Sequence, residues 1–137
     1  MKAPIVDLTG VMDKNLTRNL KVSDMVINSG SSTYGRISVG FATALDYYIQ
    51  ALRDILKLEP TTSSVYRTWY HNCELDGSVI NSNHIDGIAG DVKVGSAKQP
   101  DAAAIALGMF GPLGGIGFMK YKSKGFVHVD FGRPRKW

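Results

Sequence analysis

The chain has 137 residues, with 44% hydrophobic and 20% charged residues, which excludes a disordered chain and a membrane protein and suits one domain over residues 1–137. Its formal net charge is +4, from 16 Lys and Arg against 12 Asp and Glu, so an anionic partner is permitted but not required. The single cysteine, Cys73, excludes an internal disulfide framework.

The sequence also bears on localisation. No segment approaches the roughly 18 apolar residues that a membrane helix needs. The first residues include Lys2 but no apolar core of a secretory signal. We therefore expect a protein made in the cytoplasm without a membrane span, which needs another delivery route if its substrate lies outside.

The first 34 residues are rich in turn formers, and a long helix is predicted over residues 36–58. Apolar residues recur there at spacings of three and four, namely Ile37, Phe41, Leu45, Tyr48, Leu52 and Ile55. The opposite side carries Asp46, Gln50, Arg53 and Lys57 and is expected to face solvent. Glu59 and Pro60 end the helix.

The second half of the chain predicts an α+β fold, with the helix followed by a mostly antiparallel sheet. Strands are expected at residues 64–69, 88–94, 116–121 and 126–131, and a second helix at 101–109 after Pro100. Residues 70–83 are polar and loop-like, with room for a short helical turn. The glycine-rich run 111–117 lacks the Lys of a phosphate loop and predicts a turn that enters a strand.

Strand alternation brings three metal-binding side chains together. Asp91 faces away from the apolar side of its strand, and His128 and Asp130 share the polar side of theirs. With His84, from the loop before Asp91, these strands offer two histidines and a carboxylate, the protein ligands of a catalytic zinc. Zinc would acidify water and polarise a carbonyl oxygen. The alternative is that each histidine is only a hydrogen-bonded residue.

Three segments resemble motifs of the zinc D-Ala-D-Ala carboxypeptidase family, which includes phage endolysins, vancomycin-resistance dipeptidases and murein endopeptidases. Residues 82–91 carry Ser, His, Gly, Ala and Asp in the pattern SxHxxGxAxD. Residues 126–137 resemble FVHVDxGxxRxW, and residues 64–72 resemble SxYR followed by HN. The segments occur in the family's order. The resemblance implies a hedgehog/DD-peptidase-like fold.

The resemblance also implies site roles. His84, Asp91 and His128 match the zinc ligands, and zinc is the expected cofactor. Arg67 matches an arginine that pairs with the substrate or stabilises the oxyanion, with a surface salt bridge as its alternative. Ser82 would support the site and the substrate, or be only a turn residue.

The general base is expected to be a carboxylate near the second histidine. Several relatives carry Glu or His three residues before the last ligand, where this chain has Gly125. Asp130 is the first candidate because it shares a strand face with His128, although it could instead be a structural carboxylate that orients Arg133 or the end of the chain. His71 and Asp86 are lesser candidates.

Three further features have less specific interpretations. Cys73 is expected to be free and buried. The aromatic residues Tyr66, Trp69 and Tyr70 either line a substrate groove or pack in the core. The C-terminal third is basic, through Lys120, Lys122, Lys124, Arg133, Arg135 and Lys136, and suits an anionic wall polymer or a solvated face.

The resemblance therefore implies a zinc metallopeptidase that hydrolyses peptide bonds next to D-amino acids in peptidoglycan stem peptides. It would act as a D,D-carboxypeptidase or endopeptidase, for example as a phage lysin, with no nucleic-acid partner. One alternative is a non-catalytic cell-wall-binding or virion structural module that retains the fold. Another is a zinc hydrolase of a non-wall dipeptide.

Overall fold

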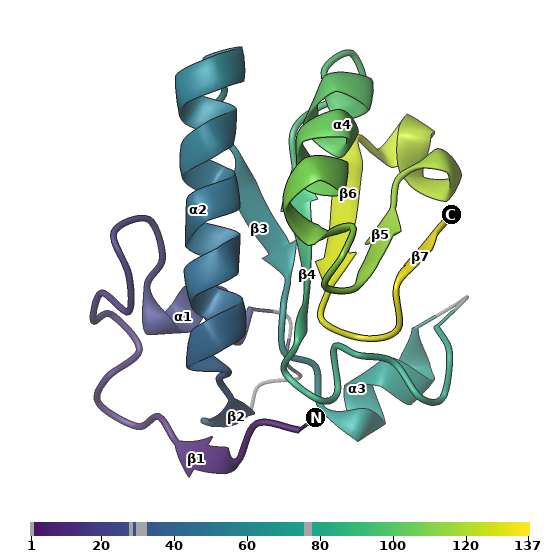
Figure 1. The fold of residues 1–137 in the computed structure, drawn as a ribbon. Helices are drawn as coiled ribbons and strands as arrows, with labels where there is room; N and C mark the ends of the chain where they lie inside the picture. The colour runs from purple at the N-terminus through teal and green to yellow at the C-terminus, as the bar shows by residue number, and fades with distance from the viewer. Residues whose placement is uncertain (1, 28, 30–32, 76–77) are drawn as a thin grey trace.

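The computed structural model describes residues 2–27, 29, 33–75 and 78–137 (Figure 1). Its main sheet has the strand order β3 (Thr61–Ser64), β4 (Ala89–Lys93), β6 (Phe126–Asp130), β5 (Gly115–Gly117) and β7 (Arg135–Lys136). All neighbours are antiparallel except β5 and β7, which are parallel. The predicted α+β fold with a mostly antiparallel sheet is confirmed.

Helices α2 (Val39–Leu56) and α4 (Gln99–Phe110) lie side by side and pack against the sheet (Figure 1). The apolar stripe of α2 is buried at four of its positions, Phe41, Leu45, Tyr48 and Leu52, and meets the inward side chains of β4 and β6, Val92, Val127 and Val129. Ile55, in the last turn, is 64% exposed, contrary to the stripe's expectation. The core thus occupies one face of the sheet and leaves the other for polar groups.

Helix α2 is shorter than expected at both ends. The Ser38 side chain accepts a hydrogen bond from the Phe41 N–H at 3.1 Å and so starts the helix at Val39. Lys57 ends it in the left-handed conformation, with φ of 56°.

The polar side of α2 is only partly the solvent-facing surface that the pattern predicts, because Lys57 is exposed whereas Asp46, Gln50 and Arg53 are half-buried. Asp46 accepts hydrogen bonds from the Thr17 hydroxyl and the Asn19 N–H, both at 2.7 Å. Arg53 donates to the Asn19 side chain. These half-buried groups anchor the segment before α1 to the helix.

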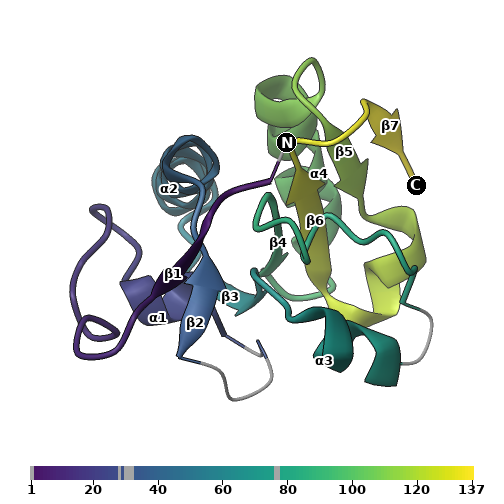
Figure 2. The ribbon, with the colours of Figure 1, turned by 90° about the horizontal axis from the view of Figure 1, so that it is seen from below.

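The turn-rich beginning of the chain contains elements that the sequence did not predict. Strands β1 (Ile5–Asp7) and β2 (Tyr34–Arg36) form an antiparallel pair, and α1 (Val22–Met25) lies beside them (Figure 2). Here Leu8, Val22, Val26 and Tyr66 form a second apolar cluster, so Tyr66 is a core residue.

The strand predicted at residues 64–69 is wrong for most of its length, because β3 ends at Ser64. Beyond it the Tyr66 N–H donates to the Met25 carbonyl at 2.8 Å and the Arg67 N–H to the His84 carbonyl at 3.1 Å. Thr68 then caps α3 (Trp69–Glu74) by accepting from the His71 N–H. These contacts outweigh the strand propensity of the segment.

The strand predicted at residues 116–121 is also too long. Strand β5 ends at Gly117 and the 3₁₀ helix η1 (Met119–Lys124) follows, because the Phe118 and Met119 N–H groups donate to the Trp137 carbonyl. The remaining predicted elements, 88–94, 101–109 and 126–131, agree with β4, α4 and β6 to within two residues. No helix in the described part of the chain is long and apolar enough to cross a membrane.

Candidate metal centre

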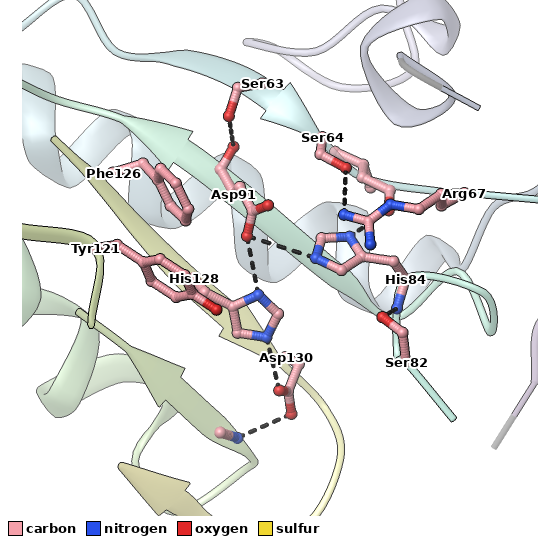
Figure 3. A network of polar contacts seen from close by, with 12 residues as sticks. Ser63, Ser64, Arg67, Ser82, His84, Asp91, Tyr121, Phe126, His128 and Asp130 are labelled. Atoms are coloured by element: carbon pink, nitrogen blue, oxygen red, sulfur yellow. Dashed lines mark hydrogen bonds and ion pairs between the residues drawn. The ribbon is translucent and has the colours of Figure 1, made fainter. Parts of the chain in front are cut away.

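The centre lies on the face of the sheet opposite α2 and α4. Strands β4 and β6 are adjacent, and Asp91 is directly paired with His128 in their register. His84 comes from the loop before β4 and is held there by the Ser82 hydroxyl, which accepts its N–H at 3.3 Å. The chain thus brings together all three residues predicted as metal ligands (Figure 3).

The three side chains form a tight, buried cluster. One ligand atom from each lies within 4.8 Å of the others. Asp91 Oδ1 is 2.9 Å from His128 Nδ1 and 3.5 Å from His84 Nε2. Two imidazoles and a carboxylate at this spacing are a donor set for a zinc or similar divalent ion.

Each histidine ring is fixed from behind by a hydrogen bond at its other nitrogen. His84 Nδ1 lies 2.7 Å from the Val65 carbonyl oxygen, which leaves Nε2 facing the cluster. His128 Nε2 lies 2.9 Å from Asp130 Oδ2, which leaves Nδ1 facing the cluster. Such partners fix tautomer and orientation in metal sites, so the residues present fit a bound metal.

The electrostatics of the cluster favour a cation. Burial by itself raises the pKa of Asp91, but His84 and His128 outweigh burial and hold that pKa well below its usual value. Burial acts to lower the pKa of His128, yet its hydrogen bonds to Asp130 and Asp91 raise it above the ordinary value. Both carboxylates are therefore ionised at neutral pH and stabilise positive charge at His128, whether a proton or a metal ion supplies it.

Asp130 is completely buried and lies behind His128. Its Oδ1 accepts the N–H groups of Gly115 at 2.9 Å and Gly132 at 2.7 Å. Burial alone would raise the pKa of Asp130, but these hydrogen bonds and that from His128 lower it to about 2. A Cβ on Gly115 would lie 2.7 Å from Asp130 Oδ2, so a glycine is needed for the close approach.

Arg67 is a buried guanidinium beside the cluster. It donates from Nη1 to the Asn72 side chain at 2.9 Å and from Nη2 to the Ser64 hydroxyl at 3.1 Å. Burial lowers its pKa, and Asp91 opposes that effect. Within the described residues its buried Nε has no hydrogen-bond partner and no carboxylate forms an ion pair with it, so the surface salt bridge is not observed.

A groove of about 820 Å³ opens over the cluster. Its lining includes Arg67, Ser82, the three cluster residues and a basic and aromatic wall of Lys120, Tyr121, Lys124, Phe126, Arg135 and Trp137. Trp69 and Tyr70, by contrast, are exposed on α3 and are not among the lining residues. The sequence did not predict that Tyr121 and Trp137 line the groove. Tyr121 was assigned to a strand at 116–121, whereas it lies in η1. Trp137 belongs to the RxW ending of the last motif, which could have indicated its place in the site.

The remaining candidates lie outside the groove. His71 is 4.0 Å from Glu74, and the Asp86 carbonyl accepts the Ala3 N–H; neither side chain is among the lining residues. Gly125 has a φ of 69°, and a Cβ there would lie 2.8 Å from the Ser96 nitrogen. The position at which the resemblance implied Glu or His therefore has no room for a side chain.

Cys73 corrects another expectation, because it is free but exposed rather than buried. It lies on α3, whose Trp69 and Tyr70 are also exposed. The short helix therefore contributes little to the core.

A comparison with curated proteins gave no match. The model of one protein family, described as peptidase M15, matches residues 18–130. This range covers most of the chain and contains the three residues of the His-Asp-His cluster. The match confirms at the family level what the three motifs implied, and the chain belongs to the M15 family of zinc-dependent peptidases.

Proposed function

We propose that this protein is a zinc peptidase that hydrolyses peptide bonds next to D-amino acids in peptidoglycan stem peptides. It would act as a D,D-carboxypeptidase or endopeptidase, with the wall lysis of a phage as its setting. The observation that carries the proposal is a buried His-Asp-His cluster at the base of a basic groove, in a chain of the M15 family.

In this proposal the metal is held by His84 Nε2, His128 Nδ1 and the Asp91 carboxylate. A zinc ion there supplies Lewis acidity, which acidifies water and polarises a carbonyl oxygen. Ser82 holds the backbone of His84, and Val65 holds its ring, so the ligand does not reorient when the substrate enters.

Arg67 would bind the substrate through a guanidinium N–H group that the described residues leave free. Its Nη groups are held by Asn72 and Ser64, which fixes the plane of the guanidinium. Nη2 donates one of its two N–H groups to Ser64, and a substrate carboxylate or the developing oxyanion in the groove would accept the other.

We assign Asp130 a positioning role in place of the proton transfer that the sequence suggested. Both of its oxygens are engaged, Oδ1 with two backbone N–H groups and Oδ2 with His128. It is fully buried, and the His128 ring lies between it and Asp91. Its carboxylate would therefore orient His128 and increase the basicity of that ligand.

One observation favours a second candidate function, wall binding without cleavage. Asp91 is the only carboxylate among the described residues that line the groove, and it belongs to the proposed ligand set. Gly125 has no room for the acid or histidine of other relatives. The described part of the lining thus contains no carboxylate or histidine outside the proposed ligand set that could act as a general base.

Two measurements test the proposal. Metal analysis of the purified protein should find about one zinc per chain, reduced strongly in His84→Ala and unchanged in His71→Ala, a histidine outside the groove. Mass spectrometry of muropeptides after incubation should then show new cleavage products. Equal zinc in His84→Ala would refute the metal site, whereas zinc and retention on sacculi without products would establish the binding function instead.

A further inference from the structure

The positive charge of the groove is distributed on both sides of the metal cluster. Four of its lining residues are cationic, Arg67, Lys120, Lys124 and Arg135, whereas Asp91 is the one anionic side chain among the described lining residues. Arg67 lies on the His84 side, since its N–H donates to the His84 carbonyl. Lys120, Lys124 and Arg135 add positive charge to the groove beyond that of Arg67.

Arg135 lies on the other side, next to His128. Its guanidinium carbon is 4.5 Å from the centre of the Trp137 ring, and that ring is 5.1 Å from the His128 ring. Arg135 Nη2 is also 3.7 Å from Asp130 Oδ2, a long ion pair. Asp130 directs its hydrogen bonds to His128 and two backbone N–H groups, so the guanidinium keeps donors for another anion.

Trp137 is a rigid support for this arginine. Its N–H donates to the Ile116 carbonyl at 3.1 Å, and its carbonyl accepts the N–H of Phe118 at 2.7 Å. A Cβ on Gly117 would lie 2.7 Å from the indole, so the glycine provides the space in which the ring lies. The indole N–H is 3.5 Å from the Tyr121 hydroxyl, which also lines the groove.

We propose that Arg135, stacked on Trp137, is a second carboxylate-binding site, and that the substrate is therefore a peptide with two carboxylates. Arg67 binds one carboxylate on the His84 side, and Arg135 binds the other on the His128 side. The planar guanidinium suits a carboxylate because it offers two parallel N–H donors, and its side chain is 41% exposed and open to the groove. The identity of the ligand as a stem peptide rests on the proposed function.

The test measures binding separately from turnover. The probes are a synthetic stem pentapeptide with one free internal carboxyl group and the same peptide with that group as a carboxamide. In a Trp69→Phe background Trp137 is the single tryptophan, and its fluorescence in stopped flow reports binding to the zinc-loaded protein before turnover. Arg135→Gln and Arg135→Lys are compared with Arg18→Gln, an exposed arginine on the segment anchored to α2.

We expect the acid to bind about tenfold more tightly than the amide, since charge-assisted hydrogen bonds have about that effect. Arg135→Gln should bind both peptides with the affinity of the amide, Arg135→Lys should discriminate partly, and Arg18→Gln should discriminate fully. The inference would be overturned if Arg135→Gln still bound the acid more tightly than the amide by the full factor. It would also be overturned if the protein with Arg135 intact bound the two peptides equally. Absence of cleavage products alongside discrimination would overturn the peptidase proposal alone.

Discussion

At the residue scale, His128 is the residue on which most of the site depends. Its two ring nitrogens face different carboxylates, Asp91 at 2.9 Å and Asp130 at 2.9 Å. A ring held at one nitrogen presents the other to a metal in one orientation only. Strand alternation correctly placed His128 and Asp130 on one face of the sheet. It could not show that the Asp130 carboxylate accepts hydrogen bonds from the N–H groups of Gly115 and Gly132.

The positioning role of Asp130 predicts the behaviour of Asp130→Asn. An amide keeps an acceptor for the backbone N–H groups but lacks the charge that orients His128 as a ligand. We expect the zinc dissociation constant to rise about 10- to 100-fold, measured by chelator competition. Asp13→Asn, an exposed acid, should bind zinc normally. Unchanged zinc affinity with a lower kcat at saturating zinc would instead indicate a proton-transfer role.

Gly117→Ala tests how Trp137 is supported. The added methyl group would lie 2.7 Å from the indole, so the ring must leave its place between Arg135 and His128. We expect Trp137 emission to shift to longer wavelength in the Trp69→Phe background. Gly108→Ala, whose Cβ would meet nothing within 4 Å, is the control. An unshifted spectrum would contradict this prediction, because it would show that the backbone of β5 moves to admit the methyl group while the Trp137 ring keeps its place.

At the element scale, periodicity predicted the elements whose own side chains decide their structure. Helix α2 follows from its 3.6-residue apolar stripe, and strands β4 and β6 follow from their alternating side chains. The alternation of β4 and β6 also places Asp91 and His128 correctly. The strand predictions for residues 64–69 and 116–121 were wrong for most of their length, because distant backbone partners decide the structure of these segments. The His84 carbonyl holds the first segment and the Trp137 carbonyl the second, and neither contact has a local signal.

Tyr48 tests the contact between α2 and α4, because its buried hydroxyl donates to the Ala102 carbonyl at 2.8 Å. Burial raises the pKa of Tyr48, while the unfolded chain ionises near pH 10. Its contribution is therefore complete below about pH 10 and falls as the pH rises, by up to about 1.4 kcal/mol per unit.

Tyr48→Phe should cost about 1 kcal/mol at pH 8, since it removes the hydrogen bond. Above pH 10 its unfolding free energy should fall less steeply than that of the unsubstituted protein. Urea unfolding at pH 8 and pH 11 measures both effects. Tyr47→Phe, at an exposed neighbour on the same helix, should change neither, and parallel pH slopes for Tyr48→Phe would contradict the argument.

At the scale of the whole molecule, the site joins segments that lie far apart in the chain. His84 comes from a loop, Asp91 from β4 and His128 from β6, while Arg67 precedes α3. The three family motifs supplied these residues, but the basic and aromatic wall required the fold, because η1 and β7 show no periodicity of their own. A metal bound here would connect the loop before β4 to the two central strands.

Zinc should therefore stabilise the folded chain as well as serve its chemistry. A ligand that binds only the native state at 1,000 times its dissociation constant contributes about 4 kcal/mol, which in a chain of this size raises Tm by about 10 °C or more. Calorimetry after chelation and after zinc is restored measures this shift. His84→Ala should show almost no response to zinc, and His71→Ala should respond fully. Reductant should leave Tm unchanged because Cys73 is the single cysteine. If zinc leaves the Tm of the unsubstituted protein unchanged, the His-Asp-His cluster does not hold it.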